Sequence, residues 1–417
     1  MNDHRGVWRA VVVSWVVVIA WLTLRSAPDQ AARVAALPWY CISCGDSGSA
    51  DIILNILLFA PLGLAARALG VRFGHMLMMV VPFTLGIELT QGLFLVGRDA
   101  SLGDVLSNTT GAAIAWWSFR ALTRMIRPTR SEGRRGAVAV LAILAAMFVA
   151  TGIAFAPVGP GDGPWVGQVL HHWPNHDPFP GTIAGVTLNG VDVPNDPLRV
   201  TPQITDGPDL VINLTRTGDS SPVRAASLVR VVDADHTIRV AVSQIGSALV
   251  LEVALRGARW RFHAPAWRFD RIMDIPLRRP ARFEFIWTRH GAQLIRTGPD
   301  ATMNRTVTIS AALDLGWIFV HPFTDTIGRR AWWWTVLWLG WWWGWLGWLS
   351  GAAGWRTVAV AGLASAGLLT IASIATGVAV GGIELAAAPV ALLVAAAGAE
   401  RLRGGAPALR RRTSSIN

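Results

Sequence analysis

The segment DIILNILLFAPLGLAARALG, residues 51–70, is apolar enough to cross a membrane but opens with the polar residues Asp51 and Asn55. The two apolar runs that follow it also contain polar side chains, and the last residue of this pattern is Gly111. Charged groups in such runs are costly to insert and are usually retained for a specific role. We therefore expect the chemistry of the chain here, at Asp51, Asn55, Glu88, Gln91, Arg98, Asp99, Asp104 and Asn108.

The composition places the chain among membrane proteins. Of its 417 residues, 52% are hydrophobic and 15% are charged, and the mean hydropathy is +0.42. The net charge of +11 comes from arginines clustered beside apolar runs, which is typical of cytoplasmic anchoring, so no nucleic-acid partner is predicted. The predicted fold class is a polytopic α-helical membrane protein with one extracytoplasmic all-β domain.

About eight transmembrane helices are predicted. The run at residues 8–24 is long and hydrophobic, so we interpret it as a retained helix rather than a cleaved signal peptide. In a later run, Gly340 and Gly344 have the spacing of a close helix-packing motif. The other seven runs cover residues 51–69, 73–96, 104–122, 136–155, 332–349, 358–376 and 378–397.

The segment between the fifth and sixth runs has a different character, because it is polar and rich in Pro, Gly and Asp. Short stretches with alternating apolar residues are separated by turn-forming clusters, which predicts a β-sandwich or jelly roll. The predicted strands include residues 209–215, 237–243, 249–255 and 282–288.

The predicted domains are a helical bundle at residues 1–156, the β domain at 157–330, three C-terminal helices at 331–400 and an Arg-rich tail at 401–417. The densest cluster of arginines, at residues 120–135, is expected to be cytoplasmic. By alternation, both termini are then cytoplasmic, whereas the β domain and the turn at Arg98 are extracytoplasmic. Arg329 and Arg330 depart from the charge rule, which long translocated domains weaken.

The spacing of the polar residues predicts three polar helix faces. Members of each pair lie three or four residues apart, so they share one face of their helix. Asp51 with Asn55, and Asp104 with Asn108, begin their helices, while Glu88 and Gln91 lie near the end of theirs. All three faces are therefore expected at the outer leaflet, with Arg98 and Asp99 in the short turn above them.

Structural roles are open for the same residues. Asp51 and Asp104 can satisfy N–H groups at helix N-termini, and Ser101 with Asp104 has the spacing of a capping box. Glu88 needs a partner or a proton, and Arg98 is the obvious partner. Interhelical hydrogen bonding is the corresponding interpretation for Asn55, Gln91 and Asn108.

Metal and redox signals are weaker. Cys41 and Cys44 form a single Cys-x-x-Cys without further zinc ligands, so a small disulfide or two idle thiols is expected. The histidines from His171 to His176 are interpreted as an exposed loop. Asp233 and Asp235 are interpreted as a strand turn rather than a calcium site. No metal or cofactor is predicted, and P-loop, GxSxG and HExxH motifs are absent from the sequence.

A family resemblance rests on five motifs, which cover about residues 8–124. They are Asp51-x-x-x-Asn55, Phe59-x-Pro61-x-Gly63, Glu88-x-x-Gln91, Arg98 six residues before Asp104, and Asp104-x-x-x-Asn108-x-x-Gly111. Together they resemble the VanZ-like family of bacterial membrane proteins. The resemblance implies a helical membrane unit associated with the cell envelope, and one family member is linked to resistance against the glycopeptide teicoplanin. It implies no established reaction.

The β segment resembles a laminin-G or concanavalin-like lectin sandwich through residues 226–232, 237–242 and 249–253. No sharp sugar-binding motif accompanies this resemblance, and a shared fold does not establish lectin activity.

Three functions stay open at this point. The first is an envelope protein of the bacterial plasma membrane, whose bundle binds a membrane lipid, a lipid-linked cell-wall intermediate or a glycopeptide, and whose β domain binds a glycan. The second is an enzyme in which Glu88 is the general acid or base, Asp104 positions water or ligand, and Arg98 binds an anionic head group. The third is an envelope sensor or assembly factor.

Overall fold

The computed structural model describes residues 3–26, 39–42, 47–98, 100–158, 165–170, 176–194, 209–219, 222–234, 237–321, 326–327 and 332–404. It divides into two compact units. Residues 1–132 and 260–262 form the first unit, and residues 133–259 and 263–417 form the second. The predicted fifth helix, residues 136–155, lies in the second unit with the β region and the last three helices.

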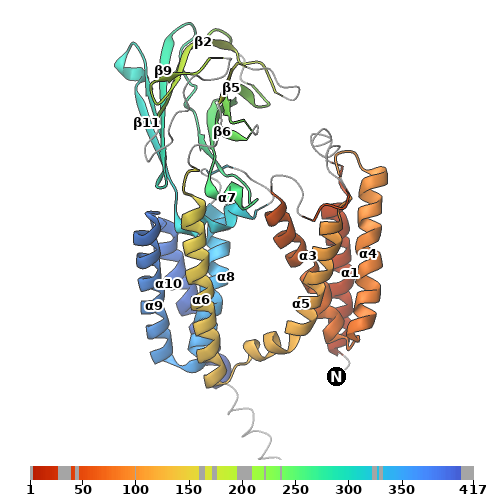
Figure 1. The fold of residues 1–417 in the computed structure, drawn as a ribbon. Coiled ribbons are helices and arrows are strands. Elements are labelled where there is room, and N and C mark those ends of the chain that lie inside the picture. Colours follow the sequence, from red (N-terminus) through yellow and green to blue (C-terminus); the bar gives the residue numbers. More distant parts are fainter. Residues whose placement is uncertain are drawn as a thin grey trace, which may run out of the picture. The chain divides into compact units, whose positions relative to one another are not determined.

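The first unit contains four long helices, one for each of the first four apolar runs (Figure 1). The turn between the second and third of them contains Gly70, whose φ of +82° is a conformation that glycine adopts without strain. A buried core of Ile19, Phe59, Met76 and Ile87 joins three of the helices. The helices are α1 (Asp3–Thr23), α3 (Gly48–Ala68), α4 (Phe73–Phe94) and α5 (Leu102–Ile126).

Helices α3 and α5 pack backbone to backbone through glycine. An added Cβ at Gly63 would overlap the carbonyl group of Ala112, and one at Gly111 would overlap the carbonyl group of Ile56. Small residues let helices approach closely where lipid supplies no hydrophobic driving force. The two glycines of the sequence motifs therefore set the distance between the helices that contain Asn55 and Asp104.

The second unit contains the other four long helices, which are α6 (Arg130–Ala154), α8 (Trp332–Ala353), α9 (Trp355–Thr376) and α10 (Gly382–Gly404). Helix α10 begins four residues after the predicted start of its run, because Gly377 adopts a left-handed φ of +73° and Ala379 makes a bridge to Ala312. Six helices are long and apolar enough to cross a membrane, counted over the described residues: α1, α3, α4, α6, α9 and α10.

The predicted packing motif in α8 is wrong. Nothing lies within 4 Å of a Cβ added at Gly340 or Gly344. Two turns further along the chain, a Cβ at Gly347 would overlap the backbone of Leu392, and one at Gly351 would overlap the backbone of Ala396. The close contact between α8 and α10 therefore uses the next pair of glycines, which has the same spacing.

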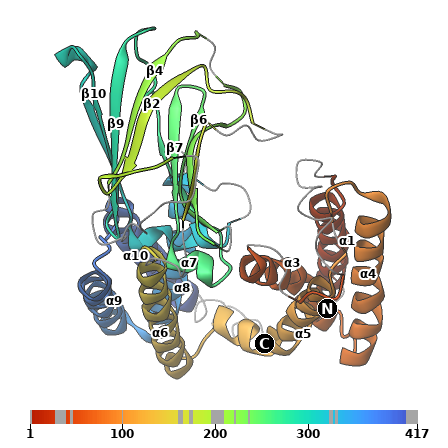
Figure 2. The same cartoon turned by 45° about the horizontal axis from the view of Figure 1, so that its top comes forward.

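The β region consists of two six-stranded sheets, and Phe269 of one sheet packs on Phe285 of the other with ring centroids 6.0 Å apart. Figure 2 shows β10, β9, β4 and β2 side by side in one sheet, and β6 and β7 in the other. The first sheet contains β1 (Val166–Val169), β5 (Ala226–Val232), β6 (Ile238–Ile245), β7 (Ala248–Val253), β8 (Ala266–Phe269) and β12 (Thr326–Ile327). The second contains β11 (Arg305–Ser310), β10 (Gly291–Thr297), β9 (Pro280–Thr288), β4 (Asp209–Arg216), β2 (Gly181–Leu188) and β3 (Val191–Asp192).

All neighbouring strands are antiparallel except β8 and β12, which pair in parallel. Short helices α7 (Arg256–Arg259), η2 (Ala301–Met303) and η3 (Leu313–Phe319) connect the elements of this unit. The predicted strands agree with β4, β6, β7 and β9 to within two residues at either end. The expected all-β region is therefore present, as two facing sheets.

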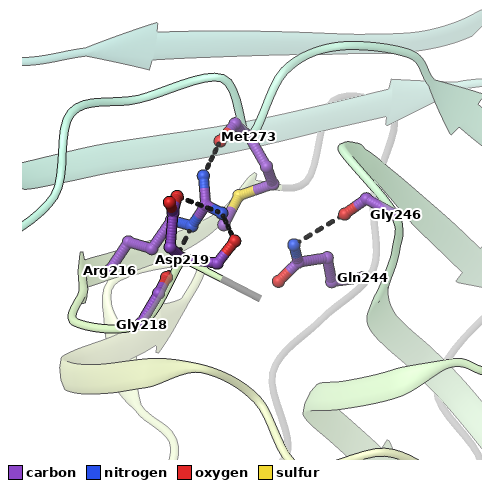
Figure 3. A network of polar contacts seen from close by, with 6 residues as sticks. All are labelled: Arg216, Gly218, Asp219, Gln244, Gly246 and Met273. Carbon is purple, nitrogen blue, oxygen red and sulfur yellow. Dashed lines mark hydrogen bonds and ion pairs between the residues drawn. The ribbon is translucent and has the colours of Figure 1, made fainter. Parts of the chain in front are cut away.

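Arginines hold several loops of the β region. The guanidinium of Arg216 donates to the carbonyl oxygens of Gly218 at 3.0 Å and Asp219 at 2.9 Å, and reaches that of Met273 at 3.5 Å (Figure 3). In the same view, Gln244 donates to the carbonyl oxygen of Gly246 at 2.7 Å. These bonds satisfy the carbonyl groups of turns that have no strand partner.

Asp233 is engaged within the fold. Its carboxylate accepts hydrogen bonds from the amide of Thr237 at 2.8 Å and from the guanidinium of Arg239 at 2.5 Å. Both side chains of this ion pair are buried. Asp235, which together with Asp233 was considered as a calcium site, lies outside the described residues, and so does His171.

Candidate functional site

The carboxylate of Glu88 is buried in helix α4, where only 5% of the residue is exposed. Its Oε2 atom accepts a hydrogen bond of 2.8 Å from the backbone amide of Ser101. Ser101 is the residue that precedes helix α5. Glu88 therefore fixes the start of α5 from a neighbouring helix, and a charged acceptor makes such a bond stronger than a neutral one.

The predicted capping box at Ser101 and Asp104 does not form, because the Ser101 side chain makes no capping bond within α5. Its hydroxyl instead donates to the carbonyl oxygen of Cys41 at 3.3 Å. The amide of Gly103 donates to the same oxygen at 3.1 Å, and the amide of Leu102 donates to the carbonyl oxygen of Trp39 at 2.9 Å. The loop before α3 therefore supplies acceptors for the first N–H groups of α5.

Cys41 is disulfide-bonded. Cys44, the other cysteine of the chain, lies outside the described residues. Gly103 lies so close to the carbonyl group of Ile42 that an added Cβ would overlap it. A disulfide in this loop stabilises the fold mainly by restricting the unfolded chain, and here it acts on the segment that holds α5.

Asn55 and Asp104 meet across the α3–α5 contact. The Nδ2 atom of Asn55 donates to Oδ1 of Asp104 at 2.7 Å. Both side chains are half-buried, whereas Asp51, one turn before Asn55, is exposed and accepts from the hydroxyl of Ser47 at 3.1 Å. The Asp51–Asn55 and Asp104–Asn108 motifs are therefore joined directly, and they extend toward the surface through Asp51.

Asn108 and Gln91 bond to partners that the sequence pattern does not indicate. The Nδ2 atom of Asn108 donates to the hydroxyl of Thr84 at 2.8 Å, and both residues are buried. Gln91 donates from Nε2 to the carbonyl oxygen of Thr23, at the end of α1, at 2.9 Å. Interhelical hydrogen bonding, one of the two interpretations for these residues, therefore describes the geometry of both.

The turn between α4 and α5 is attached to the end of α1. Arg98 donates from Nε to the carbonyl oxygen of Arg25 at 3.0 Å. The guanidinium of Arg25 lies over the ring of Trp21, 5.1 Å from its centroid. Asp99 lies outside the described residues. Arg98 thus brings positive charge to the end of the bundle at which α5 begins.

The sequence motifs therefore converge at one end of the first unit, where α3 and α5 begin and α4 ends. Sequence reasoning missed Thr84, Thr23 and the loop at Cys41. Thr84 and Thr23 give no sequence signal, because single threonines are ordinary in apolar helices. In the described part of the chain, no group of three or more His, Cys, Asp or Glu side chains is placed to hold a metal ion.

Comparison with known proteins agrees with the motifs. Residues 11–124, somewhat over a quarter of the chain, match the family model VanZ/LLP1. No match is found among curated proteins or solved structures. The matched residues include all of α3 and α4 and nearly all of α5, and with them every residue of the candidate site. The chain is thus a multi-pass membrane protein with a VanZ-like domain at residues 11–124, followed by a separate region of two β-sheets.

Proposed function

We propose that the VanZ-like domain binds the polar head of a lipid-linked cell-wall intermediate or of a glycopeptide at the end of the bundle where α3 and α5 begin. The observation that carries the proposal is the buried Glu88 carboxylate on the Ser101 amide. An acid buried in an apolar helix is costly and usually has a specific role. The position of Glu88 at the start of α5, the helix that also contains the half-buried Asp104, favours a role in a binding site.

The charges of this end suit a ligand with both donors and anionic groups. Asp51 and Asp104 offer carboxylate oxygens to hydroxyl and amide donors, as sugars and peptides carry. Arg98 offers a guanidinium suited to a carboxylate or phosphate. A lipid-linked sugar phosphate and a glycopeptide contain all of these groups.

The proposed location is the bacterial plasma membrane. The Arg-rich connection from α5 to α6, with Arg124, Arg127 and Arg130, is assigned to the cytoplasm. Both termini are then cytoplasmic. The site end of the first unit and the β region are extracytoplasmic, where lipid-linked wall intermediates are used. For the β region we propose recognition of a glycan or another envelope component, a role compatible with a two-sheet fold.

The test compares the full-length chain with its Glu88→Gln and Asp104→Asn variants, using a fluorescent lipid-linked disaccharide-peptide in nanodiscs. Glu132→Gln is the matched control, since it changes a half-buried acid in the first turn of α6, outside the proposed site. We expect at least tenfold weaker binding for the two site variants and unchanged binding for the control. Equal binding by all four proteins would contradict the proposed site.

The same assay separates binding from catalysis. Release of a labelled product by the wild type, but not by Glu88→Gln, would assign the domain to the enzymes, with Glu88 as acid or base. Binding without turnover is the result that our proposal expects. For the β region, a glycan array probed with the full-length protein in detergent is expected to give at least one specific signal, and a blank array would contradict glycan recognition.

A further inference from the structure

Two acids of the second unit are buried next to each other, and none of the described residues forms a basic partner for them. Asp314 of η3 is 4% exposed, and Glu384 in the first turn of α10 is 1% exposed. The two carboxyl groups are close enough to repel one another. Among the described residues, no arginine or histidine forms an ion pair with either acid. Burying like charges together is unfavourable unless a proton or a cation compensates them.

The structural roles of the two acids differ. The carboxylate of Asp314 lies near its own backbone amide and near that of Glu384, at the start of α10 where N–H groups have no intrahelical partner. Gly381 leaves room for this carboxylate, because an added Cβ there would overlap it. Glu384 has the Gly381 amide nearby, yet neither of its oxygens accepts a hydrogen bond of normal geometry from any described residue. Capping therefore explains Asp314 but does not explain Glu384.

A cavity of about 470 Å³ lies directly beside this pair. Asp314 and Gly381 form part of its wall, and Thr335 adds a hydroxyl. Leu315, Trp332 and Ile383 form an apolar part of the wall. Its volume is in the range of roughly 300–1,000 Å³ typical of small-molecule sites and is much larger than a single ion needs.

We propose that this cavity binds a primary ammonium group at the carboxylate of Asp314 in its wall, and that the buried carboxylate of Glu384 next to it adds negative charge. An ammonium group has three N–H donors and a full positive charge, so it satisfies the acceptors and compensates the buried charge together. The alkyl part of such a ligand fits the apolar wall, and Trp332 offers an aromatic face to the cation. A calcium ion prefers six to eight oxygen ligands, and no group of three acids or histidines is present among the described residues.

The cavity lies at one end of the second unit's helices. Helix α8 contributes Trp332 and Thr335 from its first turn, and α10 contributes Gly382 and Ile383 from its own. These two helices run in parallel, as the paired contacts of Gly347 with Leu392 and Gly351 with Ala396 show. The amine is therefore presented either by a lipid head group at the membrane surface or by a soluble molecule. This site belongs to the second unit and does not depend on the function proposed for the first.

The experiment measures the thermal unfolding midpoint of the full-length protein in detergent at pH 7.5 and constant ionic strength. Ethylammonium chloride is the probe, and sodium and tetramethylammonium chlorides are the comparisons. We expect a saturable rise of several degrees with ethylammonium only, since tetramethylammonium has no N–H donor. An equal response to all three salts would overturn the proposal.

Variants locate the effect. Glu384→Gln and Asp314→Asn keep the shape of each side chain, and we expect each to weaken the response to ethylammonium at least tenfold. Glu400→Gln is the matched control, because it changes an acid at the other end of α10 that accepts from Trp355 Nε1. If one of these two variants does not elute as a folded protein in size-exclusion chromatography, the other variant is used alone. An undiminished response in the folded variant would overturn the assignment.

Nanodiscs distinguish the two sources of the amine. Phosphatidylethanolamine and phosphatidylcholine with identical acyl chains differ only in the methylation of the ammonium group. Stabilisation by the ethanolamine lipid in the wild type, lost in Glu384→Gln, would assign the site to a lipid head group. Stabilisation by free ethylammonium with no lipid preference would assign it to a soluble amine. No stabilisation by either amine would overturn the proposal.

Discussion

Asn55 donates a hydrogen bond of 2.7 Å to Asp104, and the bond joins two helices whose bonded residues lie 49 positions apart in the chain. Gly63 and Gly111 hold those helices in backbone contact on the same interface. The motifs at the start of α3 and at the start of α5 therefore belong to one packed interface between the two helices.

The strength of this contact can be measured with a double-mutant cycle. We expect Asn55→Ala and Asp104→Ala each to destabilise the protein, with a coupling energy of about 0.5–2 kcal/mol, the range for interhelical hydrogen bonds in membranes. The measurement is unfolding of the full-length protein in mixed micelles. Strictly additive effects would show that the two side chains do not stabilise each other.

Glycine positions give a sharper test of the α3–α5 packing. Gly111→Ala puts a methyl group into the backbone of Ile56, so we expect a loss of several kcal/mol or failure to fold. Gly86→Ala in α4 is the matched control, since nothing lies within 4 Å of the added Cβ. Because alanine is the better helix former, the control is expected to gain up to about 1 kcal/mol. Similar losses in both variants would contradict this packing.

Stability should depend on pH through Asp314. Burial raises the pKa of Asp314 from 3.8 to about 6 in the folded protein, so this state binds the proton more tightly than the unfolded chain does. The neutral acid therefore adds stability at low pH, and this contribution is lost as pH rises from about 4 to about 6, by up to about 3 kcal/mol. The pH profile is best recorded in a Glu384→Gln background, which removes the neighbouring acid.

In that background, adding Asp314→Asn should flatten the profile between pH 4 and 6 and leave an acceptor for the Glu384 amide. The readout is the unfolding midpoint at each pH. A slope that persists unchanged in the double variant would assign the dependence to other groups.

The buried ion pair of the β region gives a fourth prediction. Arg239→Met leaves the Asp233 carboxylate buried without its cation, so a loss of about 3–5 kcal/mol is expected. Arg268→Met is the matched control, because its pair with Asp270 is largely exposed and is expected to contribute at most about 1 kcal/mol. For both variants, the free energy of unfolding of the full-length protein is measured by tryptophan fluorescence. Equal losses would contradict the burial argument.

Much of the architecture was readable from the sequence. Long apolar runs separated by arginines and turn residues predict helices, because the cost of placing backbone polar groups in lipid leaves few alternatives. All eight runs are helices, and the alternating stretches at residues 209–215 and 282–288 are strands. The polar positions in residues 51–111 could also be picked out, since polar residues are rare in such runs.

Partners across helices could not be read in this way. The spacing of Glu88 and Gln91 places them on one face, but nothing local indicates that Glu88 holds the Ser101 amide or that Gln91 reaches the end of α1. The same limit explains the packing motif in α8. Gly340 with Gly344 and Gly347 with Gly351 share one spacing, and only the position of α10 decides which pair is in contact.

The sequence by itself determined the helices, the strands and the positions at which charge enters apolar surroundings, because these follow from hydropathy and residue periodicity along the chain. The tertiary structure alone decided which polar side chains lie in contact. Asn55 contacts Asp104 because Gly111 lets the backbones of two helices pack closely, and Asp314 lies against Glu384 because Gly381 leaves room for the Asp314 carboxylate. Such contacts depend on distances between helices, which no local pattern encodes.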